Sequence, residues 1–385
     1  MRIATIEAFP IKLKRDLASA TGTAGSPTAL QKGVADYRWS AAYPCLYSML
    51  IETALIRVTL DSGLIGWGEA QAPVAPEIAC AIVERILVPA IGGEEFDGTL
   101  EDTHRLWWRM YSAMRVRGQN GGFMLDAISG VDLALWDLAG KIAGVSVSEL
   151  LGTQRQSVPL YLSGVAGGNL DLVRQALDGG TTNFKLYFDS DKDSVFRMLD
   201  AVSAIAGHGR VAVDALWRLT DETAYEFGKE LDERQALFLE CPFPPEDPIA
   251  HGDLARRLRT PIALGESYRT RFELAPFFRN QAMRYVQPDL GRTGITEGRV
   301  IAELARQQDV AVVPHVSIAM GPQIAAAIHF AAAQSNCPML EYNPAVLSTA
   351  NRFLAEPLRV ENGAYCVPRG PGLGVDLKAQ LYTEA

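Results

Sequence analysis

Three acidic residues at a constant spacing are the clearest chemical signal in this sequence of 385 residues. Asp214, Glu240 and Glu266 each follow a short apolar run, and the same interval separates each of them from the next. A short apolar run bounded by Gly, Pro or charge is typical of a buried strand, and the interval leaves room for a helix and two loops. The spacing therefore predicts strand–helix–strand repeats in which each strand ends in a carboxylate.

These carboxylates are predicted to bind a metal ion. If the strands are parallel neighbours in a closed barrel, their carboxyl ends meet at one mouth and the three acids converge there. Because uncompensated anions repel, we expect a hard divalent cation between them. An all-oxygen ligand set with room for water and substrate suits Mg²⁺ better than Zn²⁺, which favours His and Cys. Alternatively, each acid could simply cap a turn or a helix. That interpretation explains less well why three acids occupy the same position at the ends of consecutive predicted strands.

Asp289 and His315 end the next two predicted strands. Adjacent strand ends would allow the carboxylate to bind the imidazole, fix its tautomer and raise its basicity. The pair is predicted to be a general base. The remaining histidines lack such a context; they are His104, His208, His251 and His329.

Three further candidates lie at predicted strand ends. Lys185 and Tyr187 are two apart in the chain, so they point to the same side of their strand. Lys185 could neutralise a substrate carboxylate or pair with Asp214 or Glu240. Glu341, which ends the eighth strand, could donate a hydrogen bond to an oxyanion if protonated, or could be a structural acid.

The elements that position these residues predict an α/β fold, a modified (β/α)8 TIM barrel over residues 126–351. A helix with apolar residues every three or four positions is expected over residues 124–140. Eight strand candidates follow it, at residues 159–162, 184–188, 211–213, 237–239, 262–264, 285–286, 310–313 and 339–340.

Residues 1–125 lack this repeat and are predicted to form an α+β N-terminal capping domain. Antiparallel strands are expected at residues 1–13, 50–60 and 64–69, followed by helices at 77–87 and 100–114. The tail, about residues 352–385, contains a strand–turn–strand pattern bent at Asn362 and Gly363. We expect this tail to return to the N-terminal unit and complete the capping domain.

A long segment, residues 14–48, separates the first two strands and contains several Gly, Pro, Arg and aromatic residues. A loop of this length is usually a functional lid or a disordered insert, and the aromatic residues favour a lid. Substrate specificity is expected to depend on this lid and on loop residues such as Trp217 and Tyr268.

Composition restricts the class of protein. A net charge of -9 gives no basic excess to bind nucleic acid, so no such partner is expected. No segment reaches the ~18 apolar residues needed to span a bilayer, and the N-terminus does not have the pattern of a signal peptide. Five scattered cysteines without a CxxC pair favour a reducing cytoplasm over a disulfide framework.

Taken together, the motifs resemble those of the enolase superfamily, in its mandelate racemase subgroup, which includes muconate lactonizing enzyme-like acid-sugar dehydratases. The resemblance covers nearly the whole chain. It rests on GWGE at 66–69, ISGVDLALWDLAGK at 128–141, LLG at 150–152, QPDLGRTG at 287–294, VPH at 313–315 and GPGLG at 370–374.

This resemblance implies a capping domain that closes over the barrel, Mg²⁺ held by Asp214, Glu240 and Glu266, and a catalytic dyad of His315 and Asp289. It also implies removal of the proton α to a carboxylate, and association into a homo-oligomer. Such a carbon acid is very weak, so the enolate that forms needs electrostatic stabilisation by the metal and nearby cations.

Two positions depart from the family pattern. The second strand usually carries Lys-x-Lys with the second lysine as a base, whereas this chain has Lys185-Leu-Tyr187. Either Tyr187 is a weaker acid or base, or His315 works alone, which favours one-base elimination over racemisation. The usual Asp-x-Asn after the third strand is here Asp214-Ala-Leu216, so an expected polar neighbour of the metal is missing.

The predicted function is dehydration of an acid sugar, an aldonate or aldarate, to a 2-keto-3-deoxy acid. His315 would remove the α-proton, and the same or a nearby acid would protonate the departing β-hydroxyl. A cycloisomerase of a sugar-acid lactone or anhydro sugar acid is the alternative enzyme, because residues 313–329 are similar to the corresponding stretch of such enzymes. A metal-stabilised binding protein is the alternative outside catalysis.

Overall fold

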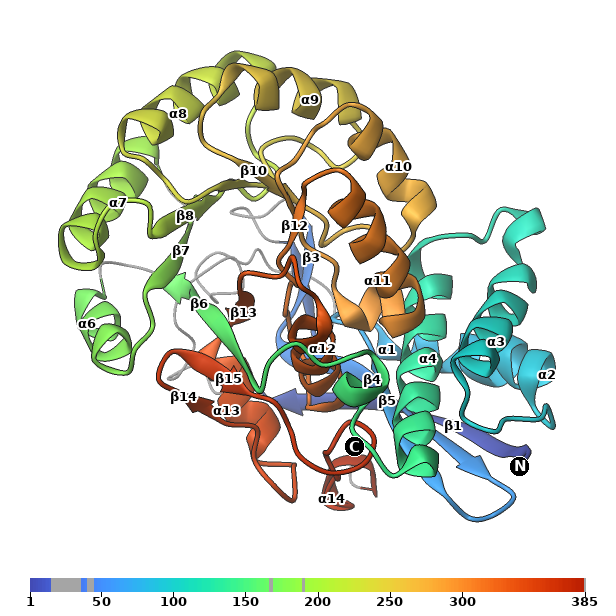
Figure 1. Cartoon of the computed structure of the whole chain (residues 1–385). Coiled ribbons are helices and arrows are strands. Elements are labelled where there is room, and N and C mark those ends of the chain that lie inside the picture. The colour runs from blue at the N-terminus through green and yellow to red at the C-terminus, as the bar shows by residue number, and fades with distance from the viewer. Residues whose placement is uncertain (15–35, 40–44, 166–168, 189–190, 384–385) are drawn as a thin grey trace.

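Eight parallel strands form the barrel that the sequence predicts. The computed structural model describes residues 1–385 except 15–35, 40–44, 166–168, 189–190 and 384–385. From β6 to β12 the strands pair in chain order, and β13 pairs with the other side of β6 (Figure 1). The N–H of Glu341 donates to the carbonyl of Pro314 at 3.3 Å, which links β13 to the end of β12. The predicted capped (β/α)8 fold is confirmed.

All eight strand positions agree with the prediction to within a few residues. The strands are β6 (Ser157–Val165), β7 (Asn183–Tyr187), β8 (Val211–Asp214), β9 (Leu239–Glu240), β10 (Ile262–Leu264), β11 (Tyr285–Val286), β12 (Ala311–Val312) and β13 (Leu340–Tyr342). The helices that follow them are α6 (Leu170–Asp178), α7 (Lys192–Ala206), α8 (Asp221–Glu233), α9 (Pro248–Arg257), α10 (Arg271–Arg279), α11 (Leu290–Gln307), α12 (Pro322–Ala333) and α13 (Pro344–Asn351).

Side chains alternate along each strand between the barrel interior and the surrounding helices. In β6, Tyr161 joins a small interior cluster with Phe238 and Met339. Its neighbours Leu160 and Leu162 instead join the large core between strands and helices. The interior cluster fills the barrel below its mouth, so polar side chains at the strand ends lie above an apolar floor.

The N-terminal unit is an antiparallel sheet packed on helices. Its strands β1 (Ile3–Lys14), β4 (Leu50–Leu60) and β5 (Ile65–Ala70) pair in the order β1-β4-β5, as the sequence predicts. The helical segments after them are α1 (Pro76–Ile82), a π-helical turn (Val83–Leu87), α2 (Val88–Ile91), α3 (Leu100–Ser112), a 3-10 turn (Arg115–Arg117), α4 (Gly122–Ala143) and α5 (Val147–Leu150).

Helix α4 joins the two units, because it packs against both β5 and the barrel helix α11. Ile128 and Val131 belong to the core of the N-terminal unit, whereas Leu133 and Trp136 belong to the barrel core. A Cβ on Gly68 of β5 would lie 2.0 Å from the carbonyl oxygen of Gly130 in α4, so only glycine permits this approach. The division of the chain at residues 125 and 126 stays a prediction.

The tail contacts both units. The hairpin of β14 (Val360–Glu361) and β15 (Ala364–Cys366) was expected on the N-terminal unit, but β15 pairs antiparallel with β6 of the barrel. The hairpin finds an open edge there because β6 extends beyond its pairing with β7 and β13. The last helix, α14 (Gln380–Thr383), does reach the N-terminal sheet, where Tyr382 packs on Phe9 and Trp67.

Most of the predicted lid, residues 14–48, lies outside the described residues. The described part is a small hairpin of β2 (Tyr37–Trp39) and β3 (Leu46–Ser48). Two hydrogen bonds fix its base to the buried carboxylate of Glu52, from Tyr37 Oη at 3.1 Å and from Ser48 Oγ at 2.5 Å.

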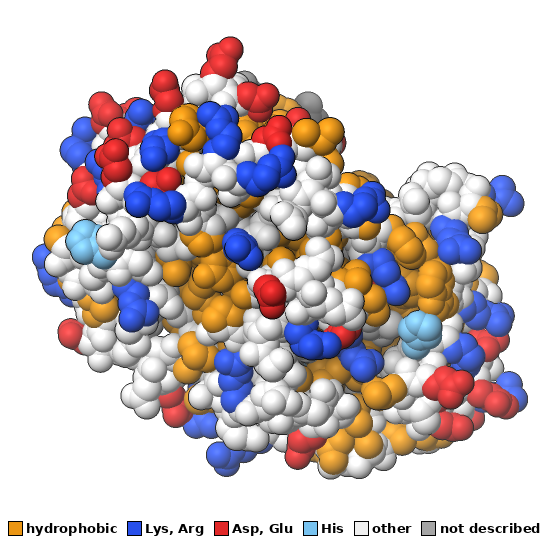
Figure 2. All heavy atoms as spheres, turned by 45° about the horizontal axis from the view of Figure 1, so that its top comes forward, with side chains coloured by type: hydrophobic (Ala, Val, Ile, Leu, Met, Phe, Trp, Pro, Cys, Tyr) orange, Lys and Arg blue, Asp and Glu red, His pale blue; other side chains and the backbone are white. Residues whose placement is uncertain are grey.

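Charged side chains of both signs are interspersed over the outer surface in Figure 2, with hydrophobic side chains between them. This mixture is typical of helices that face water on one side and a core on the other. Among the described residues, no helix has both the length and the apolar character that crossing a membrane requires.

Candidate active site

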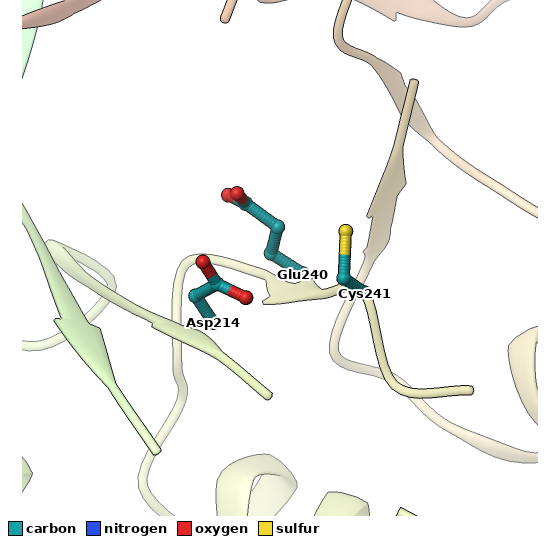
Figure 3. Close-up of side chains that lie close together, drawn as sticks. All are labelled: Asp214, Glu240 and Cys241. Carbon is teal, nitrogen blue, oxygen red and sulfur yellow. The ribbon is translucent and has the colours of Figure 1, made fainter. Parts of the chain in front are cut away.

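Two of the three predicted metal ligands lie together at the barrel mouth. Asp214 ends β8 and Glu240 ends β9, and the two residues are direct neighbours in the parallel pairing. Oxygen atoms of both carboxylates and the Sγ of Cys241 lie within 4.8 Å of one another, and Figure 3 shows the three side chains side by side. Burial and the adjacent Glu240 raise the pKa of Asp214, as expected where anions are gathered away from water.

Glu266 lies at the same mouth but faces a different neighbour. It follows β10, and its Oε2 is 3.1 Å from His315 Nε2, while its Oε1 accepts a hydrogen bond from Trp217 Nε1 at 3.3 Å. Among the described residues, the group of side chains close enough to share a metal ion includes Asp214 and Glu240 but not Glu266. Burial is the main cause of the raised pKa of both Asp214 and Glu240, and repulsion from the Glu266 carboxylate adds to it, so Glu266 is close enough to act on the other two acids.

Lys185 is the buried cation at the centre of these acids. Its Nζ lies 2.7 Å from Glu240 Oε1, 2.9 Å from Glu341 Oε1 and 3.8 Å from Asp214 Oδ2. Burial opposes the charged form, but Glu240 and Glu341 outweigh it and raise the pKa of Lys185. The lysine is therefore an ammonium ion that fixes two strand-end carboxylates in place.

His315 and Asp289 form the predicted pair. His315 Nδ1 lies 2.8 Å from Asp289 Oδ2, and the opposite ring nitrogen, Nε2, faces Glu266. Asp289 is fully buried and the His315 side chain is 13% exposed, so the imidazole is the reachable member. Burial lowers the pKa of His315, but Glu266, Glu341 and Asp289 together raise it to about 10.

Tyr187 lies beside this cluster as a protonated phenol. Its Oη is 2.8 Å from Ser163 Oγ, and the Lys185 ammonium lies 5.6 Å from the centre of its ring. Burial raises the pKa of Tyr187, against the smaller opposing effect of Lys185. A phenol that stays protonated at neutral pH can donate a hydrogen bond but is a poor base.

The position of Glu341 favours a structural acid over a hydrogen-bond donor. One oxygen pairs with Lys185, and the other accepts the backbone N–H of Val316 at 3.1 Å. Burial opposes ionisation, but Lys185 and His315 outweigh it and lower the pKa of Glu341 to about 2. An ionised carboxylate has no proton to donate to an oxyanion.

After β8, the chain has Leu216 where the family pattern Asp-x-Asn has a polar residue, and the local backbone compensates for this difference. Where the family pattern has a polar side chain, the backbone N–H of Leu216 donates to Asp214 Oδ1 at 2.9 Å. Leu216 and Trp217 both have positive φ, a conformation that turns the chain sharply and here directs this N–H at the carboxylate. The two residues predicted to determine specificity have different partners. Trp217 contacts Glu266, whereas the Tyr268 hydroxyl donates a hydrogen bond to the carbonyl of Pro245 at 2.7 Å.

Sequence reasoning missed two residues of this cluster. Gln287 is fully buried, and its Nε2 donates to Glu240 Oε2 at 2.8 Å. It lies inside the QPD segment, so its position one strand after Glu266 was the available signal. Cys241 was also missed; burial raises its pKa, so it remains a thiol, and a thiol is a poor ligand for a hard cation.

Comparison with known proteins identifies the family. Residues 39–152 match the mandelate racemase / muconate lactonizing enzyme N-terminal domain, and residues 170–381 match the enolase C-terminal domain-like family. The chain therefore belongs to the mandelate racemase and muconate lactonizing enzyme family of the enolase superfamily, as the sequence motifs predict.

Two relatives show similarity over most of their length. D-galactarolactone cycloisomerase from Agrobacterium fabrum is 32% identical over 351 residues, which cover 86% of this chain and 90% of the relative. D-galactonate dehydratase from Verminephrobacter eiseniae is 32% identical over 355 residues, with the same two coverages.

Solved structures agree in fold. A member of the enolase superfamily from Agrobacterium tumefaciens matches with a TM-score of 0.91 and 28% identity, covering 99% of this chain and 97% of that one. L-talarate dehydratase from Polaromonas sp. JS666, solved with Mg and L-glucarate, matches with a TM-score of 0.80 and 24% identity, covering 99% and 96%. At that identity the second match shows the fold alone.

Proposed function

We propose that this protein is a Mg²⁺-dependent enzyme that removes the proton α to the carboxylate of an acid sugar and dehydrates the sugar to a 2-keto-3-deoxy acid. The observation that carries the proposal is the His315–Asp289 pair, whose second ring nitrogen, Nε2, faces the carboxylates of Glu266 and Glu341 at the barrel mouth. A dehydratase of D-galactonate among the relatives supports this reaction.

The donor set fits Mg²⁺. Asp214 and Glu240 offer carboxylate oxygens to one point, and rotation of the Glu266 side chain away from His315 would add a third carboxylate. Oxygen ligands with positions left for water and substrate are the set that Mg²⁺ prefers. When bound, the ion would supply positive charge close to the substrate carboxylate and so stabilise the enolate.

The chain's own residues would carry the proton transfers. Rotation of the Glu266 side chain away from His315 would remove the strongest of the charges that raise the pKa of the imidazole. The neutral Nε2 of His315 would then take the α-proton while Asp289 holds Nδ1, and the electrons of the broken C–H bond would move into the enolate. As the enolate collapses, the bond from the β-carbon to its hydroxyl breaks, and the imidazolium returns its proton to that oxygen, which leaves as water. The resulting enol tautomerises to the ketone.

Tyr187 supports a reaction with a single base. The phenol hydrogen-bonds Ser163 and stays protonated, so proton removal from the face opposite His315 has no base among the residues of β7. Tyr187→Phe is therefore expected to lower kcat by no more than about tenfold, because only a hydrogen-bonding hydroxyl is lost. Steady-state kinetics tests this, and a loss as large as that of a His315 variant would assign Tyr187 a direct proton transfer.

Cycloisomerisation is the second candidate, because the Agrobacterium fabrum relative is a cycloisomerase at the same 32% identity. That reaction also begins with α-proton removal, but the substrate keeps its mass. The two candidate functions therefore share the site and differ in the group that leaves the β-carbon.

A mass-spectrometric screen separates these functions. The protein with Mg²⁺ is incubated with a library of aldonates, aldarates and their lactones, and products are scored for loss of water or for isomerisation at constant mass. We expect loss of water with at least one aldonate or aldarate. Isomerisation of lactones alone would favour the cycloisomerase, and no turnover with or without Mg²⁺ would favour a binding protein.

Two further features of the proposal concern the setting of the enzyme. Five free cysteines support a location in the reducing cytoplasm.

We also propose that the chain forms a homo-oligomer, which light scattering of the purified protein would test.

A further inference from the structure

A chain of buried hydrogen bonds connects the N-terminal unit to the catalytic pair. Glu69, near the end of β5, accepts the backbone N–H of Met320 at 2.6 Å and that of Gln323 at 3.1 Å. The side chain of Gln323 then donates from Nε2 to Asp289 Oδ1 at 2.8 Å. Asp289 holds His315 through its other oxygen. Glu69, Gln323 and Asp289 are each at most 1% exposed.

Glu69 supplies a cap that helix α12 lacks in its own sequence. The residue before the helix is Gly321, which has no side chain to accept the first N–H groups. Its backbone has a positive φ, which glycine adopts readily. The first N–H groups of a helix need acceptors, and an anion at this end is favoured by the helix dipole. The N-terminal unit therefore provides the acceptor for a barrel helix.

The Gln323 side chain reaches Asp289 because the residue beside its amide, Gly291, has no side chain. A Cβ on Gly291 would lie 2.4 Å from Gln323 Oε1, so a larger residue there would displace the amide. The N–H of Gly291 donates to the same Asp289 Oδ1 at 2.8 Å. Two donors on Oδ1 and the imidazole on Oδ2 together determine the orientation of the carboxylate.

We propose that Glu69 and Gln323 are positioning residues, through which the N-terminal unit sets the orientation of Asp289 and hence of the His315 imidazole. The catalytic consequence rests on the proposed function, whereas the orientation itself does not. Because Glu69 acts at the helix end and Gln323 at the carboxylate, loss of either is expected to misplace the base while the metal ligands remain in position.

Gln323→Met tests the second link, because methionine has nearly the same length but no amide donor. With an acid sugar that the wild type turns over, we expect kcat to fall about 10- to 100-fold with KM nearly unchanged. The primary isotope effect of substrate deuterated at the α-carbon should rise, because proton removal becomes slower relative to the other steps. Affinity for Mg²⁺, measured by calorimetry, should stay at the wild-type value.

The matched control is His329→Gln in the same helix. His329 is fully buried and accepts the N–H of Ser148 at 3.3 Å, but it lies further along α12, and its described hydrogen bonds reach neither Asp289 nor Glu69. This variant should lower the thermal midpoint while keeping kcat and the isotope effect. An equal loss of kcat in His329→Gln and Gln323→Met would attribute the effect to general destabilisation and overturn the proposal.

A spectroscopic measurement separates this proposal from the proposed function. In protein labelled with ¹⁵N-histidine, the resonances of His315 are assigned by their absence in His315→Asn. We expect Gln323→Met and Glu69→Gln both to shift the Nδ1 resonance of His315, and His329→Gln to leave it in place. Unchanged His315 resonances in both Gln323→Met and Glu69→Gln would overturn the positioning role, even if the enzyme acts on acid sugars. Shifted resonances in a protein that turns over no acid sugar would refute only the proposed function.

Discussion

His315→Asn is expected to lower turnover of any acid sugar about 10³-fold or more, to the detection limit of a typical assay. Asparagine can retain a hydrogen bond to Asp289 but cannot accept a proton at neutral pH. At the mouth, His315 combines a partly exposed imidazole with a buried carboxylate partner, Asp289, on its other side. Activity is measured as product formed, by mass spectrometry or a carbonyl assay.

The fold and the metal affinity should survive this substitution. His208→Asn is a suitable control with the same chemical change, because His208 is exposed in the loop that leads into β8, at the opposite end of the barrel from the mouth. Circular dichroism and Mg²⁺ titration should give wild-type results for both variants. Turnover by His315→Asn close to that of the wild type would exclude His315 as the base.

Glu240→Gln is expected to abolish Mg²⁺ binding and, with it, activity. The amide keeps the shape of the side chain but removes the negative charge that Lys185 and Gln287 hold at the mouth. Loss of outer hydrogen-bond partners alone weakens metal sites about 10- to 100-fold, so loss of a direct carboxylate ligand should cost at least as much. In the wild type, Mg²⁺ at about 100 times its Kd should stabilise the fold by about 2.7 kcal/mol.

Thermal unfolding with and without Mg²⁺ measures this effect without an assay of activity. The wild type should show an increase of its midpoint on addition of Mg²⁺, and Glu240→Gln should show none. Glu297→Gln, a buried glutamate paired with Arg271 outside the mouth, should keep the increase. An equal Mg²⁺ effect in Glu240→Gln and the wild type would show that the ion binds elsewhere.

The fold was predictable because local patterns and the tertiary structure agree. Asp214 and Glu240 follow apolar runs that form neighbouring strands, β8 and β9, so equal spacing in sequence became adjacency in space. The tail hairpin was placed on the other unit, because its sequence shows a strand pair but not the open edge of β6 that it joins. An edge is a property of the assembled sheet, and no local pattern encodes it.

The sequence predicted which residues gather at the barrel mouth, but not which of them touch, and their catalytic roles stay predictions. Strand ends located Lys185, Asp289, His315 and Glu341, since the carboxyl ends of barrel strands meet at one mouth. The sequence left the roles of Lys185 and Glu341 open, because both depend on which groups touch. In the structure Lys185 pairs with Glu240 and Glu341, and this pairing keeps Glu341 ionised. The orientation of Glu266 toward His315 is a side-chain choice that spacing cannot predict.

Contacts between the two units were the least predictable part. Glu69 stands in a motif that the sequence singles out, yet its partners are backbone N–H groups far along the chain, at Met320 and Gln323. Every residue except proline offers the same backbone donor, so the pattern of side chains does not identify these partners. The same holds for the Leu216 N–H that replaces a polar side chain beside Asp214.

The most direct test of the proposed metal site and base is a crystal structure with Mn²⁺ and a slowly reacting acid sugar. Mn²⁺ scatters anomalously and takes the same oxygen ligands as Mg²⁺. We predict one anomalous peak bonded to Asp214, Glu240 and Glu266, with the sugar's α-hydrogen directed at His315 Nε2. A peak on any other set of residues, or a sugar whose α-carbon faces away from His315, would contradict it.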